Sequence, residues 1–200
     1  MILKKNQKIY IYAIIVKLIY VYNNMIENIK FLHILTSTLI IEMIMLFLFK
    51  FTNQTSKSIN NWYNKLEWTA VILDVISIMI GFYLAKFIYQ YLVRKKYIKE
   101  KNNYLIFLLI LLVVQIIHDF SFYFLVIKPT KPGINTVLDE FKQYSKHYGV
   151  QAVIADSLIF IFTTPLLYHL SKTSDNINIF SSIVSIYIIG YLLYQKPLYI

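Results

Sequence analysis

Long apolar runs separated by short polar connections dominate this chain. Five runs approach the roughly 20 apolar residues that a helix needs to cross a bilayer. They cover residues 31–51, 68–93, 104–127, 150–170 and 177–194. The runs lack the alternating pattern of a membrane β-barrel strand. Because a helix satisfies its own backbone polar groups in lipid, the pattern predicts an all-α, multi-pass transmembrane helical bundle with five spans.

The N-terminal segment, residues 1–29, is basic and of a different kind from the bundle over residues 30–200. Its residues 9–22 are mostly Ile, Tyr and Val, a run that is short for a span. Lysines precede this run as in a signal peptide, but no small-residue cleavage site follows. We interpret residues 9–22 as an interfacial helix, with a sixth span or a cleaved signal as alternatives.

Two connections matter for the later argument. Residues 52–67 form a polar connection in which Trp62, Tyr63 and Trp68, at its end, suggest an aromatic belt at the membrane interface. The longest connection predicts an amphipathic helix over residues 136–148, capped by Asn135 and followed by Gly149. The apolar side chains of that helix share one face: Val137, Leu138, Phe141, Tyr144 and Tyr148. It would cover the bundle or lie on lipid headgroups, with partner docking as an alternative.

Composition supports a membrane protein and excludes several other classes. The chain has 200 residues, of which 58% are hydrophobic and 15% charged, against about 25% charged in soluble domains. A soluble protein of this size could not bury so much apolar surface. Cysteine is absent, which excludes disulfides, thiolate metal sites and thiol nucleophiles. The net charge of +10 arises mostly from residues between the apolar runs, so we expect no nucleic-acid partner.

The basic residues also predict an orientation. More of them fall on the side that holds the N-terminus, where the densest cluster lies. That cluster comprises Arg94, Lys95, Lys96, Lys99 and Lys101. The positive-inside rule then predicts a cytoplasmic N-terminus and a C-terminus outside. The same cluster could bind anionic lipid headgroups, at about 1 kcal/mol for each basic residue.

Six polar side chains interrupt the apolar runs and form the candidate site. They are Glu42, Asp74, Gln115, His118, Asp119 and Asp156. A charge in mid-bilayer costs at least about 2.5 kcal/mol, so such side chains normally face the bundle interior. Successive helices alternate in direction, and at about 1.5 Å of rise per residue the four acids fall roughly 9–13 Å below the same face. The sequence therefore predicts one shared polar layer.

Neighbouring positions indicate which helix faces turn inward. Gln115, His118, Asp119 and Phe122 share one stripe by their spacing along the helix. His118 points about 100° away from Asp119 around the helix, so we expect it to contact Glu42 or Asp74. Small residues on the second run follow Asp74 and would let another helix approach closely. They are Ser77, Gly81 and Ala85.

Three interpretations of the layer stay open at this point. The acids could pair with His118, Gln115 and hydroxyl groups and lock the bundle. They could bind an ion or relay protons, with His118, Asp119 and Asp156 as candidate metal ligands. They could also serve an intramembrane enzyme that uses an acid with His118. No HExxH motif or glycine-rich phosphate loop is present, and neither a cofactor nor a catalytic residue is indicated.

Residues 115–157 carry a resemblance to a known family. It rests on Gln115-Ile116-Ile117-His118-Asp119-Phe120, Phe122-Tyr123-Phe124, Lys128-Pro129, Gly133, Asn135, Asp139, Phe141-Lys142, Tyr144, Gly149 and Ala155-Asp156-Ser157. This part of the chain resembles a family of multi-pass membrane proteins of large nucleocytoplasmic DNA viruses, of the mimivirus kind. The resemblance implies a viral membrane protein of the virion or of a host membrane. It implies no catalytic residues.

Taken together, the sequence favours a non-enzymatic viral membrane component whose polar layer is structural or binds an ion. The alternative is an intramembrane enzyme or a small transporter that uses the same layer.

Overall fold

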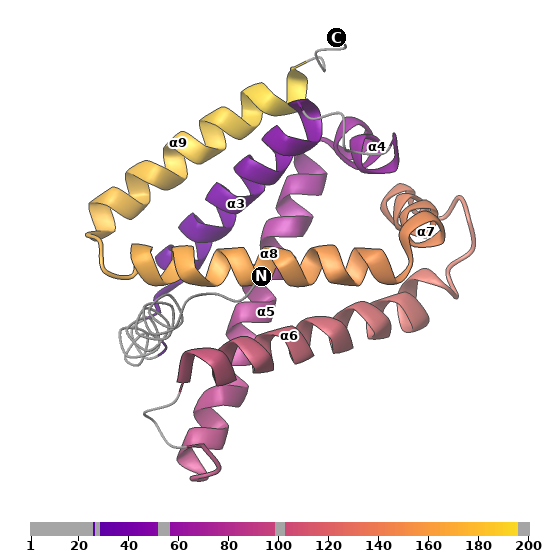
Figure 1. Cartoon of the computed structure of the whole chain (residues 1–200). Coiled ribbons are helices and arrows are strands. Elements are labelled where there is room, and N and C mark those ends of the chain that lie inside the picture. The colour runs from indigo at the N-terminus through magenta and orange to yellow at the C-terminus, as the bar shows by residue number, and fades with distance from the viewer. Residues whose placement is uncertain (1–25, 27–28, 52–56, 99–102, 196–200) are drawn as a thin grey trace, which may run out of the picture.

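The computed structural model describes residues 26, 29–51, 57–98 and 103–195, and these form helices and connections without a strand (Figure 1). Five helices are long and apolar enough to cross a membrane. They are α3 (Phe31–Phe51), α5 (Trp68–Arg94), α6 (Asn103–Phe122) with its continuation η1 (Tyr123–Ile127), α8 (Val150–Leu170) and α9 (Asp175–Tyr194). The predicted all-α bundle with five spans is confirmed. The interfacial helix predicted over residues 9–22 lies outside the described residues.

Two shorter helices lie near each other at one end of the bundle: α4 (Lys57–Leu66) and α7 (Thr136–Tyr148) (Figure 1). The range of α7 is the one that the sequence indicates. The Asn135 side chain accepts a hydrogen bond of 3.1 Å from the Leu138 amide at its start, and Gly149 follows its end with a φ of 48°. The helix α4 was not predicted, because the polar connection 52–67 was interpreted as a loop.

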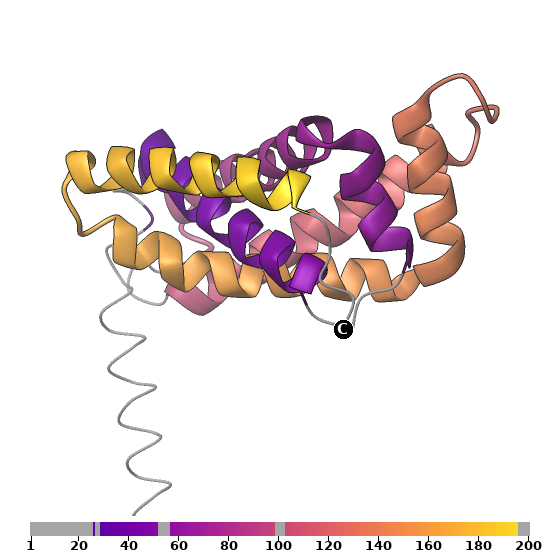
Figure 2. The same cartoon turned by 90° about the horizontal axis from the view of Figure 1, so that it is seen from above.

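The central helix of the bundle is α3. It contacts α9, α8, α5 and α4, and Figure 2 shows it between α9 and α8. A second group of contacts joins α6 to α5 and α8. Phe82 of α5, Phe107 of α6 and Phe160 of α8 form an aromatic core between these helices. The centroid of the Phe82 ring lies 5.5 Å from that of Phe160 and 6.4 Å from that of Phe107. Gly81, one of the small residues that follow Asp74 on α5, lies directly against the Phe160 ring of α8. The small residue lets the ring approach the α5 backbone closely.

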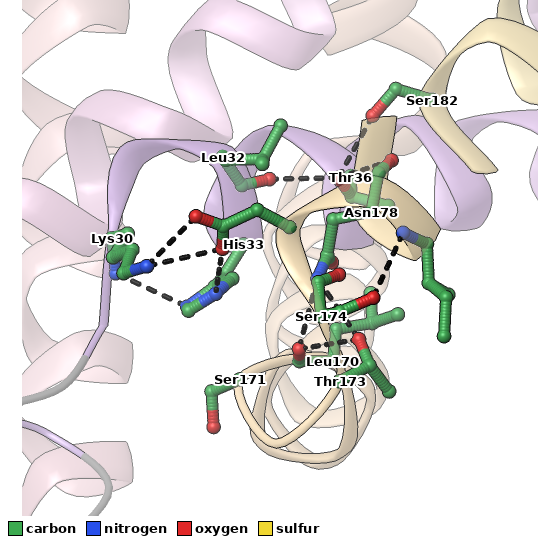
Figure 3. Close-up of polar contacts among 12 residues, drawn as sticks. Lys30, Leu32, His33, Thr36, Leu170, Ser171, Thr173, Ser174, Asn178 and Ser182 are labelled. Carbon is green, nitrogen blue, oxygen red and sulfur yellow. Dashed lines mark hydrogen bonds and ion pairs between the residues drawn. The ribbon is translucent and has the colours of Figure 1, made fainter. Parts of the chain in front are cut away.

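A polar seam holds the start of α3 against α9 (Figure 3). The Lys30 ammonium lies 3.0 Å from the Asp175 carboxylate, and the Thr36 and Ser182 hydroxyls are 2.8 Å apart. The buried Asn178 amide donates to the Leu170 carbonyl at 3.2 Å and so ties α9 to the end of α8. In lipid such polar contacts help helices to associate, because apolar surfaces gain little from leaving a hydrocarbon solvent.

The end of the α6 span has a local irregularity. In η1 the Lys128 amide donates a 2.8 Å bond to the Tyr123 carbonyl, five residues earlier. Single π-helical turns of this kind are frequent at functional sites. The wider turn lies directly before Lys128, where the apolar run predicted over residues 104–127 ends.

Candidate functional site

A cavity of about 360 Å³ lies within the end of the bundle that carries α4 and α7. We call it the acidic chamber. All six polar side chains singled out in the sequence line it: Glu42, Asp74, Gln115, His118, Asp119 and Asp156. They come from four different spans, α3, α5, α6 and α8. Among the residues that the structure describes, no Lys or Arg lines this chamber, and the basic side chain that faces its four acids there is His118.

Two residues of α4 bring the acids of α3 and α5 together. The Tyr63 hydroxyl lies 2.9 Å from Oε1 of Glu42 and 3.3 Å from Oδ2 of Asp74. The Trp62 indole donates a 3.0 Å hydrogen bond to the same Asp74 oxygen. Glu42 and Tyr63 are only 3% and 4% exposed. Burial and the nearby Glu42 and Asp74 carboxylates raise the pKa of the Tyr63 phenol well above its usual value, so Tyr63 is a neutral donor.

Three polar residues of α6 form a second group in the lining of the chamber. The Gln115 amide donates a 2.6 Å hydrogen bond to Oδ1 of Asp119, and Nδ1 of His118 lies 3.3 Å from the same oxygen. The expectation that His118 reaches Glu42 or Asp74 was wrong. Its ring instead turns back along its own helix and stacks on Phe122, with 5.9 Å between the ring centroids.

Some carboxylate oxygens of the chamber have no partner. Oδ2 of Asp119 is buried and accepts no hydrogen bond from any described residue. Asp156, on α8, also makes no hydrogen bond within the described part of the chain. A buried acceptor without a partner carries a free-energy penalty of about 1–3 kcal/mol. The chamber is therefore not a closed, fully paired polar layer.

The helix α7 covers the chamber at the end of the bundle where α4 also lies. Phe141 and Tyr144 line it, and the Phe141 ring lies 4.6 Å from the Trp62 ring of α4. Burial first, and then the negative charges of Asp156 and other neighbours, raise the pKa of the Tyr144 phenol above its ordinary value. The surface helix expected from the sequence thus carries two side chains of the site on its apolar face.

A second cavity of about 270 Å³ adjoins the acidic chamber between α6, η1, α7 and α8. We call it the aromatic cavity. The two share Asp119, Phe122, Phe141, Tyr144 and Asp156 as lining residues. The remaining wall of the aromatic cavity is mainly apolar. It includes Phe120, Phe124, Ile127, Val150 and Val153.

The candidate metal ligands do not assemble into a metal centre. Within the described residues, no group of three His, Asp or Glu side chains is placed to hold a metal ion. His118 and Asp119 are adjacent on α6 and already contact each other, and Asp156 lies on another helix. The chamber offers separate carboxylates around an open volume rather than converging ligands.

The candidate lipid-binding cluster lies apart from the chamber, beyond the end of α5. Arg94, Lys95 and Lys96 are exposed there, and Lys96 has a φ of 63° where the chain leaves the helix. Lys99 and Lys101 lie outside the described residues.

Four residues of the site were not predicted as such. Trp62 and Tyr63 were interpreted as an aromatic belt, and Phe141 and Tyr144 as part of a surface helix. Trp62, Tyr63 and Leu66 share one helical face by their spacing, a signal for α4 that the surrounding Asn and Lys residues obscured.

Comparison with known proteins finds no relative: no family model, curated protein or solved structure matches this chain.

Proposed function

We propose that this chain is an integral membrane protein whose acidic chamber binds a positively charged ligand inside the bundle. The observation that carries the proposal is the unpartnered Oδ2 of Asp119 in a cavity lined by four acids. Removing a carboxylate from water is unfavourable unless a cation or a proton compensates it. A purely structural layer would be collapsed and paired, whereas this one has free acceptors and room.

The proposal is tested by thermal unfolding of the purified protein in detergent at constant ionic strength. Chlorides of sodium, magnesium, methylammonium and tetramethylammonium would be titrated in turn. A ligand that binds only the folded state raises the melting temperature in a saturable manner. At least one of these cations should do so, and the double variant Asp119→Asn, Asp156→Asn should lose the effect.

The matched control is Asp175→Asn, which removes an acid at the other end of the bundle, where Asp175 pairs with Lys30. It should keep the cation-dependent shift although its basal stability falls. If none of the four cations gives a saturable shift, or if the double variant keeps it, the proposed function is wrong.

The sequence supports three further parts of this proposal. We propose a cytoplasmic N-terminus, with the cluster at Arg94 facing the cytoplasm and anionic headgroups. We also propose a viral or host membrane as the location, which is supported by the resemblance of residues 115–157. Retention of phosphatidylglycerol over phosphatidylcholine in native mass spectra, lost on changing Arg94, Lys95 and Lys96 to Gln, would support the headgroup contact.

A further inference from the structure

We infer that the ligand of the acidic chamber is an organic cation, an amine or quaternary ammonium that carries an apolar or aromatic group. This inference rests on the proposed function and names the ligand class of the same site. Four kinds of observation on the described residues lead to it. They are the acceptor atom without a partner, the aromatic walls, the adjoining apolar cavity and the lack of a metal-ligand arrangement among those residues.

Two acids on different helices, Glu42 on α3 and Asp119 on α6, line the chamber. Glu42 is 3% exposed, and only one of its oxygens, Oε1, accepts a hydrogen bond from a described residue. Oδ2 of Asp119 is buried and accepts no hydrogen bond within the part of the chain that the structure describes. Both side chains line the same cavity. Two carboxylates on different helices can flank one cation. The ligand then needs only a positive charge or an N–H donor to interact with each carboxylate.

Aromatic rings form much of the remaining wall. Trp62, Phe122, Phe141 and Tyr144 all line the chamber. A ring face attracts a desolvated cation by about 2 kcal/mol or more, and sets of such rings recognise quaternary ammonium groups. A hydrated inorganic ion would gain little from these rings, because it keeps its water shell. The ring-lined wall therefore favours a soft, weakly hydrated cation.

The adjoining cavity accounts for the apolar part of the ligand. Asp119 and Asp156 lie where the two cavities meet, since both line each cavity. Beyond them, the aromatic cavity has the apolar wall of Phe120, Phe124 and Val153. The acidic chamber, at about 360 Å³, falls in the range of roughly 300–1,000 Å³ that small-molecule sites occupy, and the aromatic cavity, at about 270 Å³, adds to it. A cationic head beside the acids and an apolar group beyond them would fill both.

A metal ion fits this arrangement less well. Magnesium and calcium need six or more oxygen ligands in a compact shell, and no group of three acids or histidines among the described residues provides the start of one. Gln115 and His118 contact Asp119 and hold its carboxylate in place. We therefore assign them a positioning role for Asp119.

The test uses Trp62 as a reporter within the site. The chain has two tryptophans, so Trp68→Phe leaves Trp62 as the sole source of indole emission. Benzyltrimethylammonium would be titrated into this variant in detergent, with benzyl alcohol, benzenesulfonate, sodium and magnesium as comparison ligands. We expect a saturable change of emission with benzyltrimethylammonium and no saturable change with benzyl alcohol or benzenesulfonate.

Two variants test the recognition chemistry. Asp119→Asn should weaken binding about ten-fold or more, because it removes one charged partner. Phe141→Leu should weaken it by roughly five-fold, since it removes one ring face. The matched controls are Asp175→Asn at the other end of the bundle and Phe87→Leu, a residue 63% exposed on α5. Both should leave the affinity unchanged. Native mass spectrometry of the unmodified chain with benzyltrimethylammonium repeats the test if Trp68→Phe does not fold.

The outcomes separate the two proposals. If sodium or magnesium binds and benzyltrimethylammonium does not, the organic-cation inference is wrong and the cation-binding function stands. If no cation binds, both are wrong. If benzyl alcohol binds as well as benzyltrimethylammonium and Asp119→Asn has no effect, the chamber is a neutral apolar site, and both are again wrong.

Discussion

The ammonium nitrogen of Lys65 lies 2.5 Å from Oε1 of Glu140, an ion pair that joins α4 to α7 beside the acidic chamber. The Glu140 side chain is 8% exposed and the Lys65 side chain 45% exposed. Since both helices contribute chamber-lining rings, this ion pair holds the cover of the site together. Lys65 and Glu140 are 75 residues apart in sequence, so the ion pair links two distant connections.

Reversing one charge of this pair should loosen the cover. Lys65→Glu or Glu140→Lys should each lower the free energy of unfolding by about 1 kcal/mol, because Lys65 is partly screened by solvent. Either change should also speed the labelling of a cysteine placed at Ser77, which lines the chamber. The double variant with the charges exchanged should recover most of both effects. Equal labelling rates in all four proteins would show that the pair does not hold the cover.

The Tyr144 phenol should make stability depend on alkaline pH. Its pKa is raised by burial and by Asp156, Tyr148, Asp74 and Asp119, so in the folded state it keeps its proton above the usual value of about 10. The unfolded state loses the proton first. The contribution of Tyr144 to the free energy of unfolding is therefore fully present below about pH 10. It is lost as the pH rises toward the pKa of Tyr144 in the folded state.

Replacing Tyr144 by Phe isolates this effect. The Tyr144 hydroxyl makes no hydrogen bond to a described residue, so Tyr144→Phe should match the parent protein in thermal unfolding at pH 8. At about pH 11 it should be the more stable of the two, because its ring has no proton to lose. Tyr97→Phe, at a tyrosine 77% exposed, is the control and should not gain stability at high pH. A variant that is less stable than its parent at both pH values would contradict the argument.

The sequence predicted the spans well because lipid imposes a strict length and polarity on a spanning helix. It also indicated that Asp119 and Asp156 belong near each other, because depth follows from simple helical rise. The sequence did not identify Trp62 and Tyr63 as site residues, since a short amphipathic helix of ten residues has no length signal like that of a span. The predicted direction of the His118 side chain was wrong for another reason. An ideal helical wheel ignores the rotamer that lets the ring fold back onto Asp119 and Phe122.

The proposed orientation can be tested because the chain has no cysteine of its own. Single cysteines at Lys96, after α5, and at Gln143, an exposed residue of α7, lie in connections on opposite sides of the predicted membrane. In intact cells, an impermeant maleimide should label position 143 and not position 96. Permeabilised cells should show labelling at both positions, which controls for access. Labelling of position 96 alone from outside would invert the orientation.

The contact between Gly81 and Phe160 predicts that a larger side chain at position 81 will destabilise the protein. A Cβ atom at position 81 would lie 2.9 Å from Cζ of Phe160, closer than ordinary contact. In Gly81→Ala the Phe160 ring must shift, and it is already packed against Phe82 on one side and lines the acidic chamber on another. Overpacking of this kind costs about 1–3 kcal/mol, which exceeds the gain of about 1 kcal/mol from replacing Gly by Ala in a helix.

A second glycine gives the matched control for this prediction. At Gly190 a Cβ atom would meet only Trp68, at 3.4 Å, so Gly190→Ala should unfold at the same temperature as the parent or slightly above it. Gly81→Ala should unfold at a lower temperature, and the double variant Gly81→Ala, Phe160→Leu should recover part of the loss, because leucine leaves room for the new methyl group. If Gly81→Ala instead raised the melting temperature, Phe160 would have another rotamer open to it, and the contact between Gly81 and Phe160 would not fix the position of this ring in the chamber lining.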